Sequence, residues 1–181
     1  KRAQVLVIAA VGNKLSVQII RTAGDDTFVV LAPAWRNLDG HIDRVIEVAD
    51  RIGYLSCNLQ KWEGLDRKQA WLERIPLIAV TEGKNGATAH YHGSGGRYAS
   101  LHMRAFRPDK PHVDTNRAGE SFAAAFLKCL LQEMTLESLK RGCYQEQIIR
   151  QAGNEAAVAA HLQVQTAECH FADRQIIRDL M

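Results

Sequence analysis

Residues 3–32, AQVLVIAAVGNKLSVQIIRTAGDDTFVVLA, contain the pattern that decides the fold. A short apolar run at 3–9 is followed by a helical rhythm over 13–23, and Gly24 marks the end of that helix. A second apolar run occupies 27–32. We interpret both runs as buried strands, so the stretch predicts two parallel strands joined by a right-handed helical crossover.

The same alternation continues as far as Thr81. Residues 40–50 carry an apolar stripe at helical spacing, residues 51–57 form a third apolar run, and residues 63–73 favour another helix. Leu77–Thr81 (LIAVT) is a fourth apolar run, which we also interpret as a buried strand. Strands that alternate with helices predict an α/β fold with a mainly parallel sheet and helices on both faces.

The rhythm changes after Gly83. Two short strand-like stretches, at 87–92 and 97–103, are separated by the small residues 93–96, which is a hairpin signal. We therefore expect an antiparallel edge on the sheet. His90 and His92 alternate on the first of these stretches and share a face, but two histidines are too few for a metal site.

The rest of the chain is mostly helical in pattern. Five apolar residues share one helical face, namely Phe122, Ala125, Phe126, Cys129 and Leu130. A further helical region spans about 136–161, with Gly153 and Asn154 as an interruption that could divide it into two helices. A last helix is expected at about 173–180.

Composition narrows the classes of function. The 181 residues suit one domain or a large part of a bigger one. No apolar stretch reaches about 18 residues and no signal-peptide pattern opens the chain, so we expect no membrane partner. The net charge of +3 is spread along the chain, so we expect no nucleic-acid partner. Because Lys1 runs directly into a strand-like stretch, we expect that an N-terminal portion is absent.

The cysteines and tryptophans are interpreted as core residues. The four cysteines form no C-x-x-C pair and lie in apolar segments, which indicates reduced thiols in a reducing, cytoplasmic compartment. The tryptophans could stack on a base or a sugar, although such residues more often cover the edge of a core; they are Trp35, Trp62 and Trp71.

Residues 113–126, VDTNRAGESFAAAF, carry the chemistry. They form a polar turn that opens directly into an amphipathic helix, whose first amides lack intrahelical acceptors and attract anions. Ala118 and Gly119 are small enough to let a ligand approach this backbone. Glu120 stands at the same place. It suits a base that removes a proton from a hydroxyl attacking a phosphate, and equally suits a simple first-turn cap.

This segment resembles the D-T-x-G-A-G-D signature of the ribokinase-like, or PfkB, carbohydrate kinases, which include nucleoside kinases. The resemblance implies that Glu120 is the catalytic base and that Ala118 and Gly119 form the anion hole for the transferred phosphate. It also implies contacts to the nucleotide from the turn itself, which comprises Asp114, Thr115, Asn116 and Arg117.

Three further segments are similar to parts of the same family. Residues 80–87 resemble its T-x-G-x-x-G stretch, which implies a nucleotide-side turn built on Thr81, Gly83 and Gly86. Asn154 resembles an asparagine near the adenine at the start of a late helix, and Asn58 resembles the first residue of the family's N-x-x-E stretch near the phosphates. Without the resemblance, a plain hairpin turn and helix caps explain these residues equally well.

The chain also departs from the family pattern. Glu120 replaces the usual Asp, Arg117 replaces a Gly, and Lys61 stands where the N-x-x-E stretch has its Glu. The longer acid changes the reach of the base. Arg117 either strains a turn that needs positive φ or adds a cation to the phosphate site. A lysine at position 61 is inconsistent with the way the family usually binds magnesium.

The resemblance implies a ribokinase-like three-layer sandwich, in which residues 1–181 form one α/β domain, the C-terminal nucleotide-binding part of a larger fold. It implies an ATP- and Mg²⁺-dependent transfer of the γ-phosphate to a hydroxyl of a sugar or nucleoside. It leaves open a homodimer, and it leaves open a non-catalytic nucleotide-binding relative with a regulatory or structural role.

Overall fold

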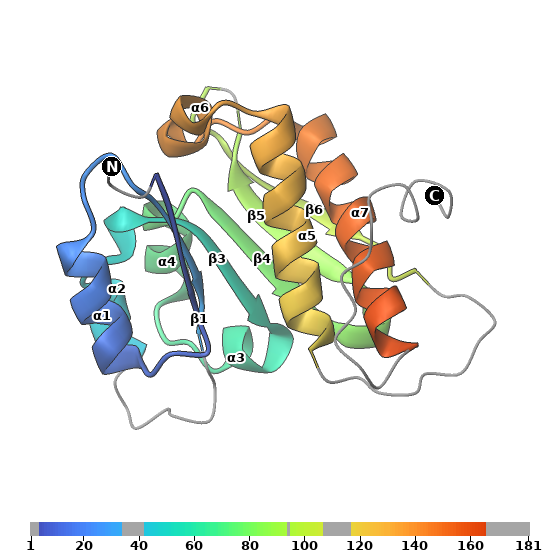
Figure 1. Ribbon diagram of the computed structural model, residues 1–181, viewed down its shortest axis with the longest axis horizontal. Coiled ribbons are helices and arrows are strands. Elements are labelled where there is room, and N and C mark those ends of the chain that lie inside the picture. The colour runs from blue at the N-terminus through green and yellow to red at the C-terminus, as the bar shows by residue number, and fades with distance from the viewer. Residues whose placement is uncertain (1–3, 34–41, 94, 107–116, 166–181) are drawn as a thin grey trace.

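The computed structural model describes residues 4–33, 42–93, 95–106 and 117–165 (Figure 1). The sheet has six strands in the order β1-β2-β3-β4-β5-β6. β1 to β4 pair in parallel, and β5 and β6 continue the sheet in antiparallel fashion. The strands are β1 Val5–Ala9, β2 Phe28–Ala32, β3 Ile52–Asn58, β4 Leu77–Thr81, β5 Ala87–His92 and β6 Tyr98–Met103.

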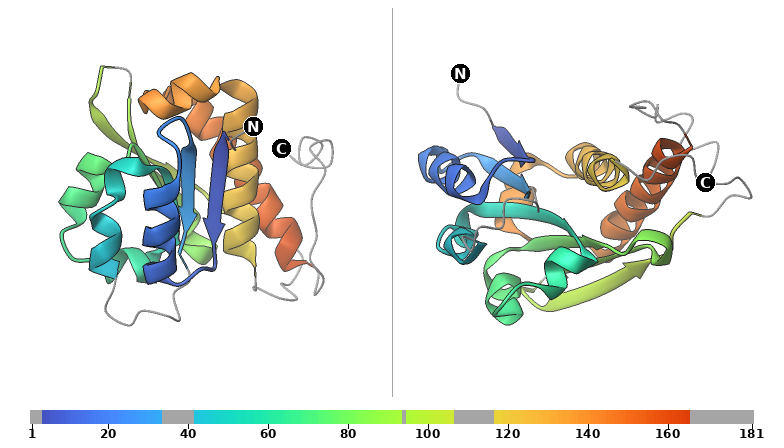
Figure 2. Two further views of the ribbon diagram at one scale, coloured as in Figure 1. Left: turned by 60° about the vertical axis from the view of Figure 1, so that its left-hand side comes forward. Right: turned by 90° about the horizontal axis from the view of Figure 1, so that it is seen from below.

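Helices cover both faces of this sheet, which gives three layers (Figure 2). One helical layer follows the parallel crossovers and consists of α1 Asn13–Thr22, α2 Ile42–Ile46, the short 3-10 helix η1 Ala49–Arg51, α3 Leu59–Glu63 and α4 Lys68–Arg74. The other layer follows the hairpin and consists of α5 Ala118–Glu133, α6 Leu136–Arg141 and α7 Glu146–Val164. The predicted mainly parallel α/β sandwich with an antiparallel edge is confirmed.

The central strands are apolar on both sides because each side meets helices. In β2, Phe28 and Val30 pack into the core beneath α5 and α7, whereas Val29 and Leu31 pack into the core beneath α1 to α4. β4 divides in the same way. This two-sided burial explains why both strands read as continuous apolar runs in the sequence.

β1 is the exception among the predicted buried strands. It is confirmed as a strand, but its burial was predicted wrongly, because it lies at the end of the strand order with β2 as its one partner there. Ile8 is buried, whereas Val7 is 54% exposed and Ala9 is also exposed. The side of β1 that faces the α5 layer is thus mostly uncovered.

Several helix boundaries also differ from the sequence prediction. The helix expected at 63–73 begins only at Lys68, as α4, because α3 ends at Glu63. The described part of the stripe at 40–50 divides between α2 and η1. The break in the late helical region lies between α6 and α7, and not at Gly153. The helix expected at 173–180 lies outside the described residues.

α7 runs unbroken through Gly153 because this glycine lets the helix pack closely on the sheet. A Cβ added at Gly153 would lie 1.9 Å from Sδ of Met103 on β6. The close packing of α7 on β6 therefore offsets the weak helix propensity of glycine.

The cysteine prediction holds in part. Cys57 and Cys129 are buried and reduced, as expected, but Cys143 is exposed, and Cys169 lies outside the described residues. Trp62 and Trp71 are buried in the core, whereas Trp35 lies outside the described residues. No helix in the described ranges is long and apolar enough to cross a membrane.

Candidate active site

Three segments meet at one end of the sheet. The parallel strands point their carboxyl ends toward the lower end of the molecule in Figure 1, where α5 also begins. Asn58 ends β3, Thr81 ends β4, and Arg117 precedes α5. Ligands of open α/β sheets bind at such carboxyl ends, so the fold brings these predicted site segments to a suitable edge.

The first turn of α5 begins from an unusual backbone conformation. Arg117 is the N-cap residue with φ 64° and ψ 2°, and its side chain makes no capping hydrogen bond. Its carbonyl accepts from the Ser121 amide at 2.9 Å, so the helix starts here. Arg117 thus occupies the positive-φ position that a glycine holds at lower cost. Asp114, Thr115 and Asn116 lie outside the described residues.

The backbone beyond Arg117 is accessible. Ala118 is half-buried, and Gly119 and Glu120 are exposed. In the described part of the chain, a Cβ added at Gly119 would meet nothing within 4 Å beyond its chain neighbours and its own helix. An anion therefore has room to approach the first amides of α5, beside the Glu120 carboxylate.

The last turn of α7 supports the start of α5. The Ser121 hydroxyl donates to Oε1 of Gln163 at 3.5 Å, and Gln163 is buried. Sequence reasoning missed this contact, because a glutamine near a helix end gives no signal without the helix pairing. It holds the residue that follows Glu120 in place.

The glycine turn after β4 is confirmed, and both of its glycines have positive φ. The Glu82 amide donates to the Gly86 carbonyl at 2.7 Å, and the 3-10 helix η2, Gly83–Asn85, lies between them. Gly83 has φ 59°, and Gly86 has φ 108°. A Cβ at Gly86 would lie 2.1 Å from the Met103 carbonyl oxygen. The turn therefore sits against the backbone at the end of β6.

Asn58 and Lys61 make structural contacts at the end of β3. The Asn58 side chain accepts from the Lys61 amide at 2.9 Å and caps α3. The Lys61 ammonium donates to the Pro33 carbonyl at 2.7 Å, which links this segment to the end of β2. The described residues contain no group of three or more histidine, cysteine, aspartate or glutamate side chains that could hold a metal.

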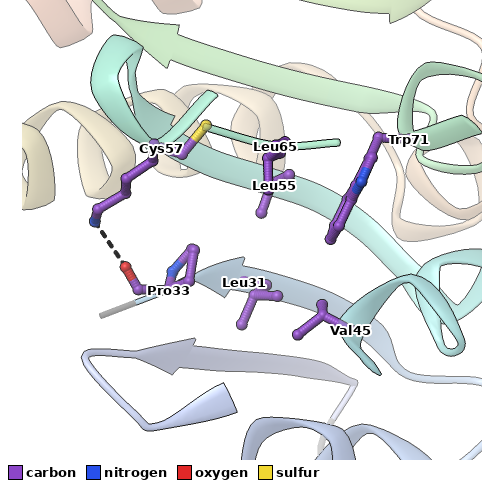
Figure 3. Close-up of a pocket in the computed structure, with 8 residues that line it drawn as sticks. Leu31, Pro33, Val45, Leu55, Cys57, Leu65 and Trp71 are labelled. Atoms are coloured by element: carbon purple, nitrogen blue, oxygen red, sulfur yellow. Dashed lines mark hydrogen bonds between the residues drawn. The ribbon is translucent and has the colours of Figure 1, made fainter. Parts of the chain in front are cut away.

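A small apolar void lies between Leu31, Leu55 and Trp71 (Figure 3). Its volume of about 10 Å³ is too small for a sugar or a nucleotide. Burial raises the pKa of the Cys57 thiol in its wall to about 12, so this cysteine stays protonated and unreactive. The void is lined by Leu31, Pro33, Val45, Leu55, Cys57, Lys61, Leu65 and Trp71.

Asn154 does not begin a helix. It lies exposed in the interior of α7, so the prediction that it starts or caps a late helix is wrong. Gln163, which contacts the first turn of α5, lies nine residues after Asn154 in α7. At the rise of an α-helix, nine residues correspond to about 14 Å along the helix axis. The structure therefore does not bring Asn154 next to Glu120.

Comparison with solved structures agrees with this architecture. The chain is similar to a fructokinase from Xylella fastidiosa with bound ATP, with a TM-score of 0.75, 16% identity and coverage of 93% of this chain and 56% of the other. It is similar to ribokinase from Giardia lamblia, with a TM-score of 0.74, 18% identity and coverage of 99% and 60%. It is also similar to a Burkholderia thailandensis nucleoside kinase in complex with inosine, with a TM-score of 0.67, 14% identity and coverage of 91% and 51%.

These neighbours are all longer than the present chain, which spans 51% to 60% of their lengths. No protein-family model and no curated protein sequence matches the chain. The identities are low, so the likeness establishes architecture alone. The chain has the ribokinase-like α/β fold.

Proposed function

We propose that this chain is the nucleotide-binding, C-terminal part of a sugar or nucleoside kinase that transfers the γ-phosphate of ATP to a hydroxyl. The observation that carries this proposal is the accessible first turn of α5, with a carboxylate in that turn. ATP in the similar fructokinase and inosine in the similar nucleoside kinase support the choice of substrates.

In the proposed reaction, the amides of 118–120 stabilise negative charge on the phosphoryl group as it moves. Glu120 removes the proton from the acceptor hydroxyl, whose oxygen forms the new bond to the γ-phosphorus. The bond from that phosphorus to the β,γ-bridging oxygen breaks, and ADP leaves. Glu120 is exposed, so an acceptor can reach it without rearrangement of the helix.

Mg²⁺ has no assigned protein ligand in this scheme. The Asn58 carboxamide oxygen already accepts a hydrogen bond, and a lysine ammonium stands where the family has a carboxylate. No step of the proposed reaction uses a protein-held metal. Thr81, Gly83, Gly86 and Asn154 stay proposed nucleotide contacts, as do the turn residues before Ala118.

The second candidate is a non-catalytic nucleotide-binding relative. The Lys61 contact to Pro33 favours it, because this cation serves to join two strand ends where a kinase is expected to handle phosphate and metal. Binding of ATP without turnover on any acceptor would identify this case.

The test replaces Glu120 with Gln in the protein and measures ADP release with a panel of sugars and nucleosides. Loss of a general base lowers kcat by about 10² to 10⁴, while the affinity for ATP changes little. Glu120→Asp should keep part of the activity. Glu137→Gln is the matched control, because Glu137 is exposed on α6 at the opposite end of the molecule (Figure 1). Near-parental turnover in Glu120→Gln would show that Glu120 is only a first-turn acid.

A further inference from the structure

A polar cluster fastens the glycine turn to the antiparallel hairpin. The Thr88 hydroxyl donates to Oε1 of Glu82 at 2.5 Å, and the same hydroxyl lies 3.2 Å from Nδ1 of His102. Nδ1 of His102 lies 3.9 Å from Oε1 of Glu82. We call Glu82, Thr88 and His102 the turn cluster; it joins the end of β4 to β5 and β6.

The sheet register places these three residues together. Thr88 and His102 are direct partners in the β5–β6 pairing. Their sequence neighbours Ala87, Ala89 and Met103 pack into the core beneath α5 and α7, so the turn cluster lies on the opposite face of the sheet. Thr88 pairs with Val80 of β4, and Glu82 follows β4 two residues after Val80, within reach of the Thr88 hydroxyl.

Glu82 is both the first residue of the glycine turn and the acid of the cluster. Its amide closes the turn onto Gly86, and its side chain is only 18% exposed. On the other side, Gly86 rests on the backbone of Met103, Arg104 and Ala105. The turn is thus fixed to the end of β6 at two points, one through backbone packing and one through the turn cluster.

We propose that the turn cluster positions the glycine turn for the nucleotide and that protonation of His102 tightens it. The first half of this inference rests on the proposed function, because it takes the turn as a nucleotide contact. With His102 neutral, the hydroxyl bridge alone links β6 to Glu82. With His102 charged, Nδ1–H donates to Thr88 while the imidazolium attracts the Glu82 carboxylate.

Other ionisable groups surround the cluster and enter the same equilibrium. His90 on β5 lies within the field of Glu82, and burial lowers its pKa more than that field raises it. His90 therefore remains neutral to lower pH than an exposed histidine does. Lys84 in the turn and Arg104 after β6 are the charged residues of the adjoining segments. Because His90 also senses Glu82, the test must separate the two histidines.

The experiment follows the backbone amides of Gly83 and Gly86 by NMR from pH 5 to pH 8, without ATP. In the parent, both amide shifts should follow the titration of the His102 ring. Glu82→Gln keeps an acceptor for Thr88 but removes the charge, so it should flatten this response, as should His102→Gln. Thr88→Val should speed hydrogen exchange of the turn amides several-fold, and Thr88→Ser should restore the exchange rates of the parent.

ATP affinity supplies the second readout. In the parent, ATP should bind about two- to threefold more tightly at low pH than in Glu82→Gln, the size expected for a half-exposed ion pair. His92→Gln is the control, because His92 contacts the Leu72 carbonyl at the far end of β5. Comparison with this control cancels the titration of ATP itself.

The two readouts separate the possible failures. If the amide shifts of Gly83 and Gly86 do not change with pH in the parent, or change equally in Glu82→Gln, the proposed role of the turn cluster is wrong, whether or not ATP binds. A pH response of the turn in a protein that binds no ATP would support the cluster as an anchor and overturn the proposed function. A pH-dependent turn with ATP affinity unchanged across the variants would overturn the role in nucleotide positioning.

Discussion

Two turns at the same end of the sheet use glycine for opposite reasons. The turn at 82–86 needs glycine because Gly83 and Gly86 both have positive φ, and because Gly86 lies against the end of β6, where no Cβ fits. The turn at 117–120 has glycine where there is space, and it places an arginine at its own positive-φ position. The turn at 82–86 is fixed by contacts within the protein, whereas the backbone at 117–120 is left accessible, as binding of a ligand would require.

The comparison is tested most strongly at Gly86. Gly86→Ala should lower the free energy of unfolding by about 3 kcal/mol, because the new methyl group overlaps the Met103 carbonyl and the residue keeps φ 108°. Urea denaturation of the parent and the variant measures this change. A loss below about 0.5 kcal/mol would mean that the turn relaxes easily and is not fixed by β6.

The contrasting substitution is Gly119→Ala. Because its Cβ meets open space in a helical turn, the variant should be more stable than the parent by about 0.5 to 1 kcal/mol. The same methyl group lies where an anion would approach, so affinity for ATP should fall about tenfold, the loss of roughly one good hydrogen bond. Calorimetric titration with ATP checks this, and unchanged affinity would remove the anion site from the start of α5.

Much of this arrangement could be predicted from the sequence. The apolar runs of β2 and β4 were identified because each is buried on both faces, and the small residues between β5 and β6 marked the hairpin. The positive φ of both glycines in the 82–86 turn follows the T-x-G-x-x-G spacing. Local pattern suffices where neighbouring residues alone determine the backbone.

The rest depends on contacts between segments far apart in the chain. The exposure of Val7 reflects the position of β1 at the sheet edge, which apolar content alone does not reveal. Gly153 stays helical because Met103 lies against it, so the predicted interruption was wrong. The turn cluster needs the pairing of Thr88 with His102, which no single-strand pattern supplies.

The smallest expected effect concerns Arg117. Arg117→Gly relieves a left-handed conformation worth about 1 kcal/mol, but the added freedom of the unfolded chain costs about 0.4 to 1 kcal/mol. The net change in unfolding free energy should therefore stay within about 0.5 kcal/mol. If the guanidinium serves the phosphate site, ATP affinity should fall a few-fold, and more at low ionic strength than at high.

Arg67 provides a matched control for this last prediction. It is also an N-cap residue with positive φ, 53°, but it precedes α4, which lies on the opposite face of the sheet from α5. Arg67→Gly should reproduce the stability change of Arg117→Gly without any change in ATP affinity. Equal ATP affinities for the two variants at low salt would show that the Arg117 side chain does not contribute to ATP binding, so that binding does not explain its strained backbone. The difference between the two turns would then rest on Gly119 and Glu120 alone.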